Sequence, residues 1–221
     1  MKKLNLAILC KQAEIFSMEE DIHNEKTLYG VTDGKKVGTY IEQKFREFLH
    51  NKNFEFDHGS AAVGVDFPSL NVDIKTTSNT QPQSSCPFKS AEQKIYGLGY
   101  SLIVFVYEKT DNQLTKTANL HITDTIFVDA ERTADFQITK GILEILARKG
   151  NSDDLFAFLT EKNLPLDEIG MVKLAEKLLQ LPPKQGYLTI SNALQWRLQY
   201  KRVIDEAGSV DGLKEIYRGK K

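Results

Sequence analysis

Apolar side chains recur at three- and four-residue steps through residues 37–53, the spacing that places them on one face of an α-helix. A less regular version of this spacing covers residues 4–22. Further segments with helical spacing lie in the second half of the chain, at residues 138–148, 153–162, 167–181 and 193–207. The hydrophobic pattern therefore predicts two helices near the N-terminus and a largely helical C-terminal part.

Residues 100–107 form an almost unbroken run of β-branched, aromatic and other apolar residues. Such a run predicts a strand buried on both faces at the centre of a sheet. Weaker strand patterns cover residues 54–56, 63–67, 70–77, 120–128 and 187–190. Residues 78–89 are rich in Ser, Gln, Asn and Pro and are expected to form a loop, after which Ser90 caps a short helix that ends near residue 96.

The order of these elements predicts an α/β protein with a mixed β-sheet core flanked by helices. We expect residues 1–130 to form the core together with the N-terminal helix. Residues 131–221 are expected to form a mostly helical C-terminal lobe within the same compact unit. A chain of 221 residues with 41% hydrophobic content is long enough to bury such a core.

Composition excludes several classes of protein. No apolar run approaches the roughly 20 residues that are needed to cross a bilayer, so no membrane partner is expected. The apolar stretch at residues 4–10 is interrupted by Asn5 and lacks a small-residue cleavage site, which argues against a secretory signal. The two cysteines, Cys10 and Cys86, cannot build a disulfide framework and are expected to be reduced thiols in a cytoplasm.

The net charge of −1 excludes a polycation that binds nucleic acid through its bulk charge. The charge is uneven, however, because residues 184–221 contain eight Lys or Arg against four Asp or Glu. Any face that binds DNA must therefore be local. The four histidines are scattered along the chain, which argues against a zinc site.

Two aspartates and a lysine lie close together in the segment of residues 65–76. Asp73 and Lys75 are two apart on a predicted strand, so they project from the same face. A Pro-Ser turn precedes that strand, and the resulting hairpin brings Asp66 alongside. Paired carboxylates can hold Mg²⁺ against a phosphate, and a lysine can orient the attacking water and offset negative charge. This arrangement is what phosphodiester hydrolysis requires.

The short motif alone is weak evidence, because an acid two residues before a lysine also occurs at Glu42 to Lys44 and at Glu92 to Lys94. Those two pairs lie on predicted helices, where positions two apart do not share a face. The alternative for the third pair, Asp73 and Lys75, is a strand edge that simply faces solvent.

The wider sequence strengthens the catalytic interpretation. Val-Gly at residues 37–38, an apolar residue followed by Glu at 41–42, Asp-Phe at 66–67 and Leu-Asn-Val-Asp-Ile-Lys-Thr at 70–76 together resemble the MutH-type branch of the PD-(D/E)xK restriction-endonuclease superfamily. That branch includes a mismatch-repair nicking enzyme and related type II restriction enzymes. The likeness covers about residues 36–78, roughly a fifth of the chain, and it includes the six residues between the two aspartates.

The resemblance implies roles for single residues. Asp66, Asp73 and the backbone carbonyl of Ile74 would hold the metal, and Lys75 would be the catalytic lysine. Glu42, on the first helix, would complete the acidic cluster through metal-bound water; the alternative is a solvated glutamate placed favourably near a helix start. The sequence departs from the family in having Asp73 where Glu is more usual, which can alter the geometry around the metal.

Residues that could contact DNA are polar or basic and lie in two places, the segment after the catalytic strand and the C-terminal part. They are Asn79, Gln81, Gln83, Lys89, Lys94, Gln195, Arg197 and Lys201. For Lys94 we consider a place near the scissile phosphate. For each of them the alternative is an ordinary surface or core position.

The leading hypothesis is a site-specific endonuclease of double-stranded DNA, most simply a type II restriction enzyme, which uses Mg²⁺ or, as a substitute, Mn²⁺. Such an enzyme would act as a monomer or homodimer beside a cognate DNA methyltransferase, without a stable complex between the two. One alternative is a MutH-like nicking or structure-specific endonuclease. Another, of a different class, is a non-catalytic DNA-binding protein in which the acidic hairpin is incidental.

Overall fold

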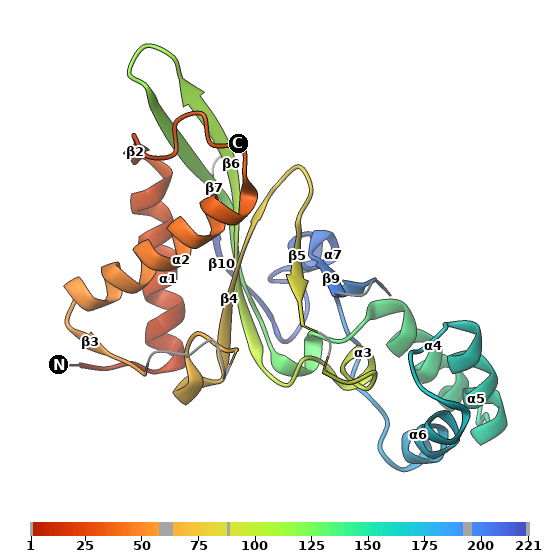
Figure 1. Ribbon diagram of the computed structural model, residues 1–221. Helices are drawn as coiled ribbons and strands as arrows, with labels where there is room; N and C mark the ends of the chain where they lie inside the picture. The colour runs from red at the N-terminus through yellow and green to blue at the C-terminus, as the bar shows by residue number, and fades with distance from the viewer. Residues whose placement is uncertain (1, 58–63, 88, 192–195, 220–221) are drawn as a thin grey trace.

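The computed structural model describes residues 2–57, 64–87, 89–191 and 196–219, and the elements below are those of the described residues (Figure 1). The first half contains β1 (Lys2–Lys3), α1 (Leu6–Asp21), β2 (Asn24–Glu25), α2 (Gly34–Asn51), β3 (Phe54–Glu55), the 3-10 turn η1 (Pro68–Leu70), β4 (Val72–Ser78), β5 (Gln83–Cys86), α3 (Gln93–Tyr96) and β6 (Ser101–Asn112). The second half contains β7 (Thr117–Val128), η2 (Ala130–Arg132), α4 (Phe136–Ala147), α5 (Ser152–Glu161), α6 (Glu168–Gln180), β8 (Thr189–Ile190), β9 (Trp196–Gln199), α7 (Lys201–Glu206) and β10 (Leu213–Arg218).

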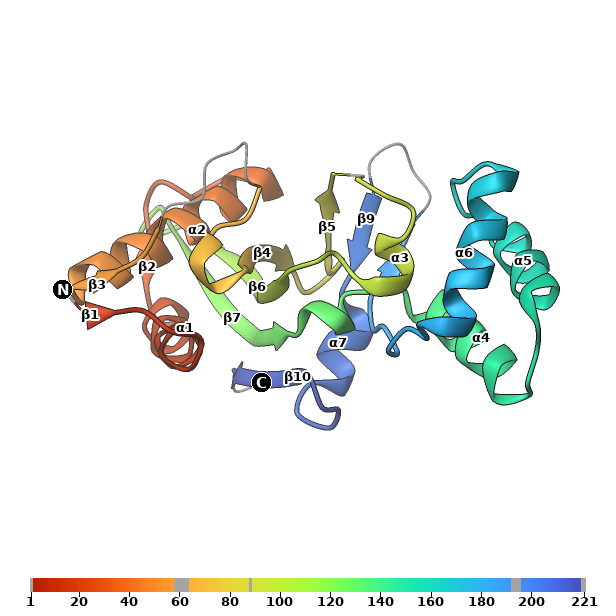
Figure 2. The same ribbon diagram turned by 90° about the horizontal axis from the view of Figure 1, so that it is seen from below.

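The main sheet has the strand order β10-β7-β6-β4, and the short strand β2 also pairs with β7. Strand β4 runs parallel to β6, and the remaining pairs are antiparallel. Helices α1 and α2 lie against one face of this sheet, while a smaller sheet of order β5-β9-β8 lies on its other side (Figures 1 and 2). The expected mixed α/β fold with flanking helices is confirmed.

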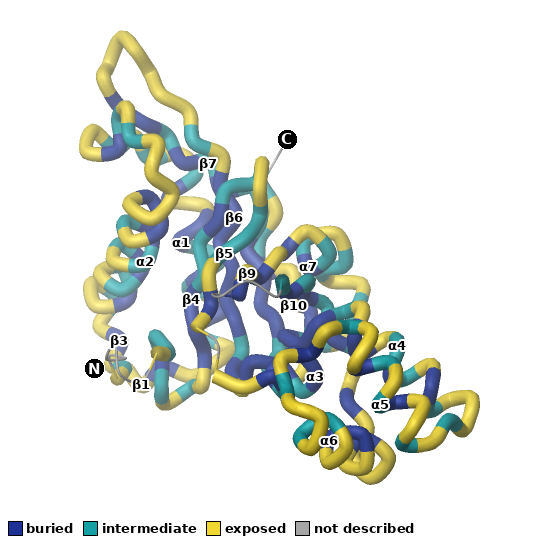
Figure 3. The backbone as a smooth tube through the Cα atoms, turned by 45° about the vertical axis from the view of Figure 1, so that its right-hand side comes forward, coloured by how far each residue is buried: buried dark blue, intermediate teal, exposed yellow. Residues whose placement is uncertain are grey.

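The two faces of the central strand β6 pack into two different hydrophobic cores. Its odd-numbered residues, such as Ile103 and Phe105, join the core beneath α1 and α2. Its even-numbered residues, such as Leu102 and Val104, join a second core beneath β8, β9 and α7. Because both faces are covered, residues 102–107 of the strand are apolar at successive positions and buried (Figure 3). The predicted central strand is confirmed.

Helices α4, α5 and α6 pack on one another at the end of the molecule opposite α1 and α2 (Figures 1 and 2). Each begins at a side chain that accepts backbone N–H groups, and these caps are Asp135, Asn151 and Asp167. Their buried residues form a third core of mostly Leu and Ile. The three helices predicted between residues 138 and 181 are therefore confirmed, within two residues at each end.

The element predictions for residues 78–89 and 193–207 are wrong. Residues 78–89 contain strand β5 rather than only a loop. The helix expected over residues 193–207 is replaced, where the structure describes it, by strand β9 and the short helix α7. Trp196 and Tyr200 are both buried at a four-residue step, which imitates a helix. The alternation of buried Trp196 and Leu198 with exposed Arg197 and Gln199 shows that the local period is two.

The strand expected at residues 63–67 is wrong within its described part, residues 64–67. There Phe67 makes only a single antiparallel bridge to Val72, and η1 lies between them. The end of the chain was also not anticipated, because β10 joins the main sheet beside β7. Cys10 and Cys86 are both buried, and they are not joined in a disulfide. No helix among the described residues is long and apolar enough to cross a membrane.

Candidate active site

Asp73 and Lys75 lie on the same face of β4, as the two-residue spacing predicts. The Nζ atom of Lys75 lies 2.6 Å from Oδ2 of Asp73, and both side chains are largely buried. The backbone N–H of Ile74, the residue between them, donates to Oδ2 of Asp66 at 2.7 Å. The structure therefore brings Asp66, Asp73 and Lys75 together at the beginning of β4.

The turn before β4 positions Asp66. The backbone groups of Phe67 and Val72 exchange hydrogen bonds of 2.9 and 3.3 Å, and η1 closes the loop between them. Asn71 adopts a left-handed conformation with φ of 53°, which an Asn tolerates at modest cost. The ring of Phe67 is fully buried against Phe45 of α2. Because Phe67 is anchored in the core, the neighbouring Asp66 is held over β4.

Helix α2 forms the opposite wall of the site. A Cβ added to Gly38 would lie 3.8 Å from Cβ of Thr76, so this helix packs directly on β4. Glu42 and Arg46 are four residues apart and share the face of α2 that turns toward Asp66. The guanidinium of Arg46 donates to Oδ1 of Asp66. Sequence reasoning missed Arg46, because no local pattern marks a helix residue that meets a distant loop.

The site holds an excess of buried negative charge. Burial, together with Asp66, raises the pKa of Asp73 to about 6, although Lys75 opposes the shift. Burial and Asp66 likewise raise the pKa of Glu42 to about 7. Burial alone would lower the pKa of Lys75, but the neighbouring Asp73 outweighs it and the pKa is raised. Carboxylates that resist ionisation in a cluster are suited to a cation, which stabilises their charged form.

The donor set fits a hard divalent ion. Asp66 and Asp73 offer carboxylate oxygens, the ligands that Mg²⁺ prefers. In an extended strand the N–H and C=O of one residue point to the same edge, so the carbonyl of Ile74 is expected to face the side of Asp66. No group of three or more His, Cys, Asp or Glu side chains with metal-binding geometry occurs in the described ranges. Direct side-chain ligation would therefore rest on the two aspartates, with Glu42 acting through water.

A groove of about 1110 Å³ runs along this site between the N-terminal half of α2, strand β4, the β4–β5 connection and the outer end of β6. Six of the residues proposed from the sequence line it: Glu42, Lys75, Asn79, Gln81, Gln83 and Arg197. Thr76 Oγ1 and Asn79 Oδ1 are buried at this groove and have no hydrogen-bond partner among the described residues. Polar atoms of this kind are available to a ligand.

Further groove residues were not predicted. Ser84 and Ser85 lie on β5, which the sequence suggested was a loop, and Lys35 and Lys109 carry no local pattern that distinguishes them from other surface lysines. Hydroxyl and ammonium groups in these positions add donors for phosphate and base edges. The positions of Ser84 and Ser85 become recognisable only once the pairing of β5 with β9 is known.

Three of the proposed DNA-binding residues, Lys89, Lys94 and Lys201, do not line the groove. Lys89 is exposed beyond the end of β5. Lys94 is buried, and its Nζ donates to the carbonyl of Ile190 at 2.8 Å, which places it between α3 and β8 rather than at a phosphate. Lys201 is exposed and lies 3.3 Å from Asp205. Gln195 falls outside the described residues.

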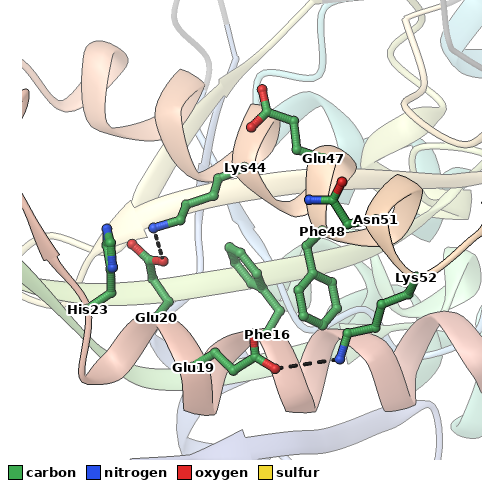
Figure 4. Close-up of a pocket in the computed structure, with 9 residues that line it drawn as sticks. All are labelled: Phe16, Glu19, Glu20, His23, Lys44, Glu47, Phe48, Asn51 and Lys52. Carbon is green, nitrogen blue, oxygen red and sulfur yellow. Dashed lines mark hydrogen bonds and ion pairs between the residues drawn. The ribbon is translucent and has the colours of Figure 1, made fainter.

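A second pocket, of about 480 Å³, lies between α1 and α2 (Figure 4). Two ion pairs join charged side chains that line it. Lys44 lies 2.7 Å from Glu20, and Lys52 lies 3.5 Å from Glu19 (Figure 4). These pairs connect the two helices across the pocket. They make it a part of the helix packing rather than a second candidate for catalysis.

The mixed sheet, the Asp and Lys two apart on β4 and the acid before the turn define a restriction-endonuclease-like protein. Residues 3–215 match the model of the family described as Type II restriction enzyme NspV. Type II restriction enzyme NspV of Nostoc sp. (strain ATCC 29411 / PCC 7524) is 61% identical over 218 residues, which cover 99% of each chain. No solved structure matches the chain.

The chain therefore belongs to the NspV family of type II restriction enzymes, and it is an enzyme of the site-specific deoxyribonuclease class. The resemblance to restriction enzymes that was carried by a fifth of the sequence extends over nearly the whole chain. The alternative of a non-catalytic DNA-binding protein is thereby set aside.

Proposed function

We propose that the enzyme cuts double-stranded DNA at a short sequence with Mg²⁺ held by Asp66, Asp73 and the carbonyl of Ile74. The observation that carries this proposal is the meeting of the two aspartates with Lys75 at the edge of a groove lined by polar side chains. When bound, the ion would polarise the phosphate and stabilise charge on the leaving oxygen.

The chain's own residues would position the reactants. Lys75 lines the groove, so its Nζ can orient the attacking water and donate to a phosphate oxygen. Glu42 lines the same groove from the opposite wall and can accept from a water molecule. Asp73 holds Lys75 through the ion pair along β4. Phe67 and the turn before β4 keep Asp66 within reach of both.

The metal requirement has a direct test. Plasmid DNA incubated with the purified enzyme and Mg²⁺ or Mn²⁺ is expected to give discrete linear fragments, and EDTA is expected to abolish them. Sequencing of the fragment ends then reads the recognition sequence and the stagger. Cutting that persists in EDTA would contradict the metal site. Nicked circles as the sole product would point instead to a nicking enzyme.

The groove also predicts which basic residue of the C-terminal part contacts DNA. Arg197 lines the groove from β9, whereas Lys201 lies outside it and is paired with Asp205. Replacing Arg197 with alanine is expected to weaken binding to cognate DNA by about tenfold to a hundredfold, the effect of losing one good contact. The matched change of Lys201 to alanine is expected to leave affinity nearly unchanged. Fluorescence anisotropy in Ca²⁺ measures both, and equal losses would contradict this assignment.

A sequence-specific nuclease requires protection of its host's DNA, so a cognate methyltransferase that modifies the same sequence is part of the proposal. Because both enzymes would read the same DNA site at different times, no stable complex between them is proposed. The enzyme itself would act as a monomer or homodimer in the cytoplasm. Sedimentation with and without cognate DNA distinguishes the two assemblies.

A further inference from the structure

We propose that Arg46 is an internal counter-ion that holds Asp66 in the metal-free enzyme and competes with the divalent cation for it. Arg46 is then a positioning residue rather than a ligand. This inference rests on the metal site of the proposed function, and it adds a residue that the sequence motif does not contain.

The contacts of Asp66 carry the inference. Its Oδ1 accepts from the guanidinium of Arg46, and its Oδ2 accepts from the N–H of Ile74 at 2.7 Å. Both carboxylate oxygens are therefore engaged by donors of the protein itself. The Asp66 side chain is only 16% exposed, so a cation that binds Oδ1 comes close to the positive charge of Arg46. The guanidinium therefore opposes metal binding at Oδ1 by charge repulsion, and this repulsion is relieved when the donor moves away.

Arg46 is the donor that can give way most easily. The N–H of Ile74 belongs to β4, which is paired with β6 through its whole length. Lys75, the other cation of the site, sits on the same strand and is 19% exposed. Arg46 instead reaches the site from α2 on a long side chain that is 33% exposed. Moving a guanidinium on a flexible stem disturbs less structure than moving a backbone group of the sheet.

The surroundings offer the displaced guanidinium a new partner. Glu42 lies one helical turn before Arg46 on the same face of α2, and opposite charges at this spacing attract. The charge of Arg46 already lowers the pKa of Glu42, against the larger effect of burial. When a cation takes Oδ1 of Asp66, the guanidinium can thus remain beside a carboxylate. The exchange leaves no buried charge without a partner.

Calcium titration without DNA tests the competition. By calorimetry, Arg46→Gln is expected to bind Ca²⁺ about tenfold more tightly than the unmodified enzyme, since a partly exposed, charge-assisted hydrogen bond no longer has to be broken. The matched control is Lys44→Gln, which removes another cation of α2 from its carboxylate, Glu20 (Figure 4). It is expected to leave Ca²⁺ affinity unchanged. Asp66→Asn is expected to weaken Ca²⁺ binding strongly.

A second readout uses the unmodified protein and does not depend on the folding of a variant. The ¹⁵Nε–H signal of Arg46, assigned by its loss in Arg46→Lys, is expected to shift and to exchange faster with solvent as Ca²⁺ saturates the site. Two results would overturn the inference. One is Ca²⁺ binding by folded Arg46→Gln that is unchanged or weaker. The other is an Arg46 signal that does not change when Ca²⁺ saturates the site. Failure of the proposed metal site is distinguishable, because Asp66→Asn and Asp73→Asn would then leave Ca²⁺ binding intact.

Discussion

Replacement of Asp73 by asparagine is expected to slow DNA cleavage by at least about a thousandfold, because one of the two proposed charged metal ligands is lost while the shape of the side chain is kept. Asp73 is buried at the beginning of β4 and pairs with Lys75, so the change also removes the group that holds the lysine. Single-turnover cleavage of cognate DNA with Mg²⁺ measures the loss. Circular dichroism and a melting curve show that the variant is folded.

The chain supplies a matched control with the same local sequence spacing. Glu92 also precedes a lysine by two residues, but it lies at the start of α3 and pairs across the surface with Lys177 at 2.6 Å. Glu92→Gln is expected to cleave at the unmodified rate. A fast Asp73→Asn enzyme, or equal losses in the two variants, would show that the strand position of Asp73 has no catalytic meaning.

This contrast also shows why part of the site could be predicted from the sequence. Alternation along a strand is a local property, so Asp73 and Lys75 could be placed on one face without any knowledge of the fold. Asp66 was expected to arrive by a hairpin, and it does arrive, although through a 3-10 turn and a single bridge. The residues Pro68 and Ser69 predicted that the chain reverses there, but they did not predict the type of turn.

The remaining parts of the site depend on contacts between distant segments. Arg46 meets Asp66 only because α2 packs on β4, and no residue near Arg46 indicates that partner. Residues 83–86 become a strand by pairing with residues 196–199, more than a hundred positions later. That pairing brings Arg197 to the groove. Local propensity cannot reveal a strand whose stability comes from its partner.

The fold could be predicted where burial makes apolar residues recur along the sequence at the spacing of a helix or a strand. Helices α4 to α6, each with a cap and an apolar stripe, were expected within two residues. The buried part of strand β6 was expected at residues 100–107, but its exposed continuation to Asn112 was not. Strand β10 was missed because only Leu213 and Ile216 of its six residues are buried, and a β-bulge disturbs their alternation. Such a strand has no clear period of two.

Replacement of Phe45 by alanine is expected to lower the free energy of unfolding by about 3–5 kcal/mol, the usual cost of removing a buried aromatic ring. Phe45 lies on α2, and its ring is fully buried. Its centroid lies 5.1 Å from that of Phe16 and 5.3 Å from that of Phe105. It also meets the ring of Phe67 at 6.4 Å. Urea denaturation measures the loss, and Phe45→Leu, which leaves a smaller cavity, is expected to lose less.

The same substitution is expected to slow cleavage at temperatures where the variant is still folded. Phe67 directly follows Asp66, and Arg46 directly follows Phe45, so the cavity lies beneath two groups of the proposed metal site. Phe158→Ala provides the comparison, since that ring packs over Gly141 in the distant helical part. It is expected to lower stability without slowing cleavage. If both variants lost activity only in proportion to their unfolded fraction, the core beneath α2 would support the fold alone and not the placement of Asp66.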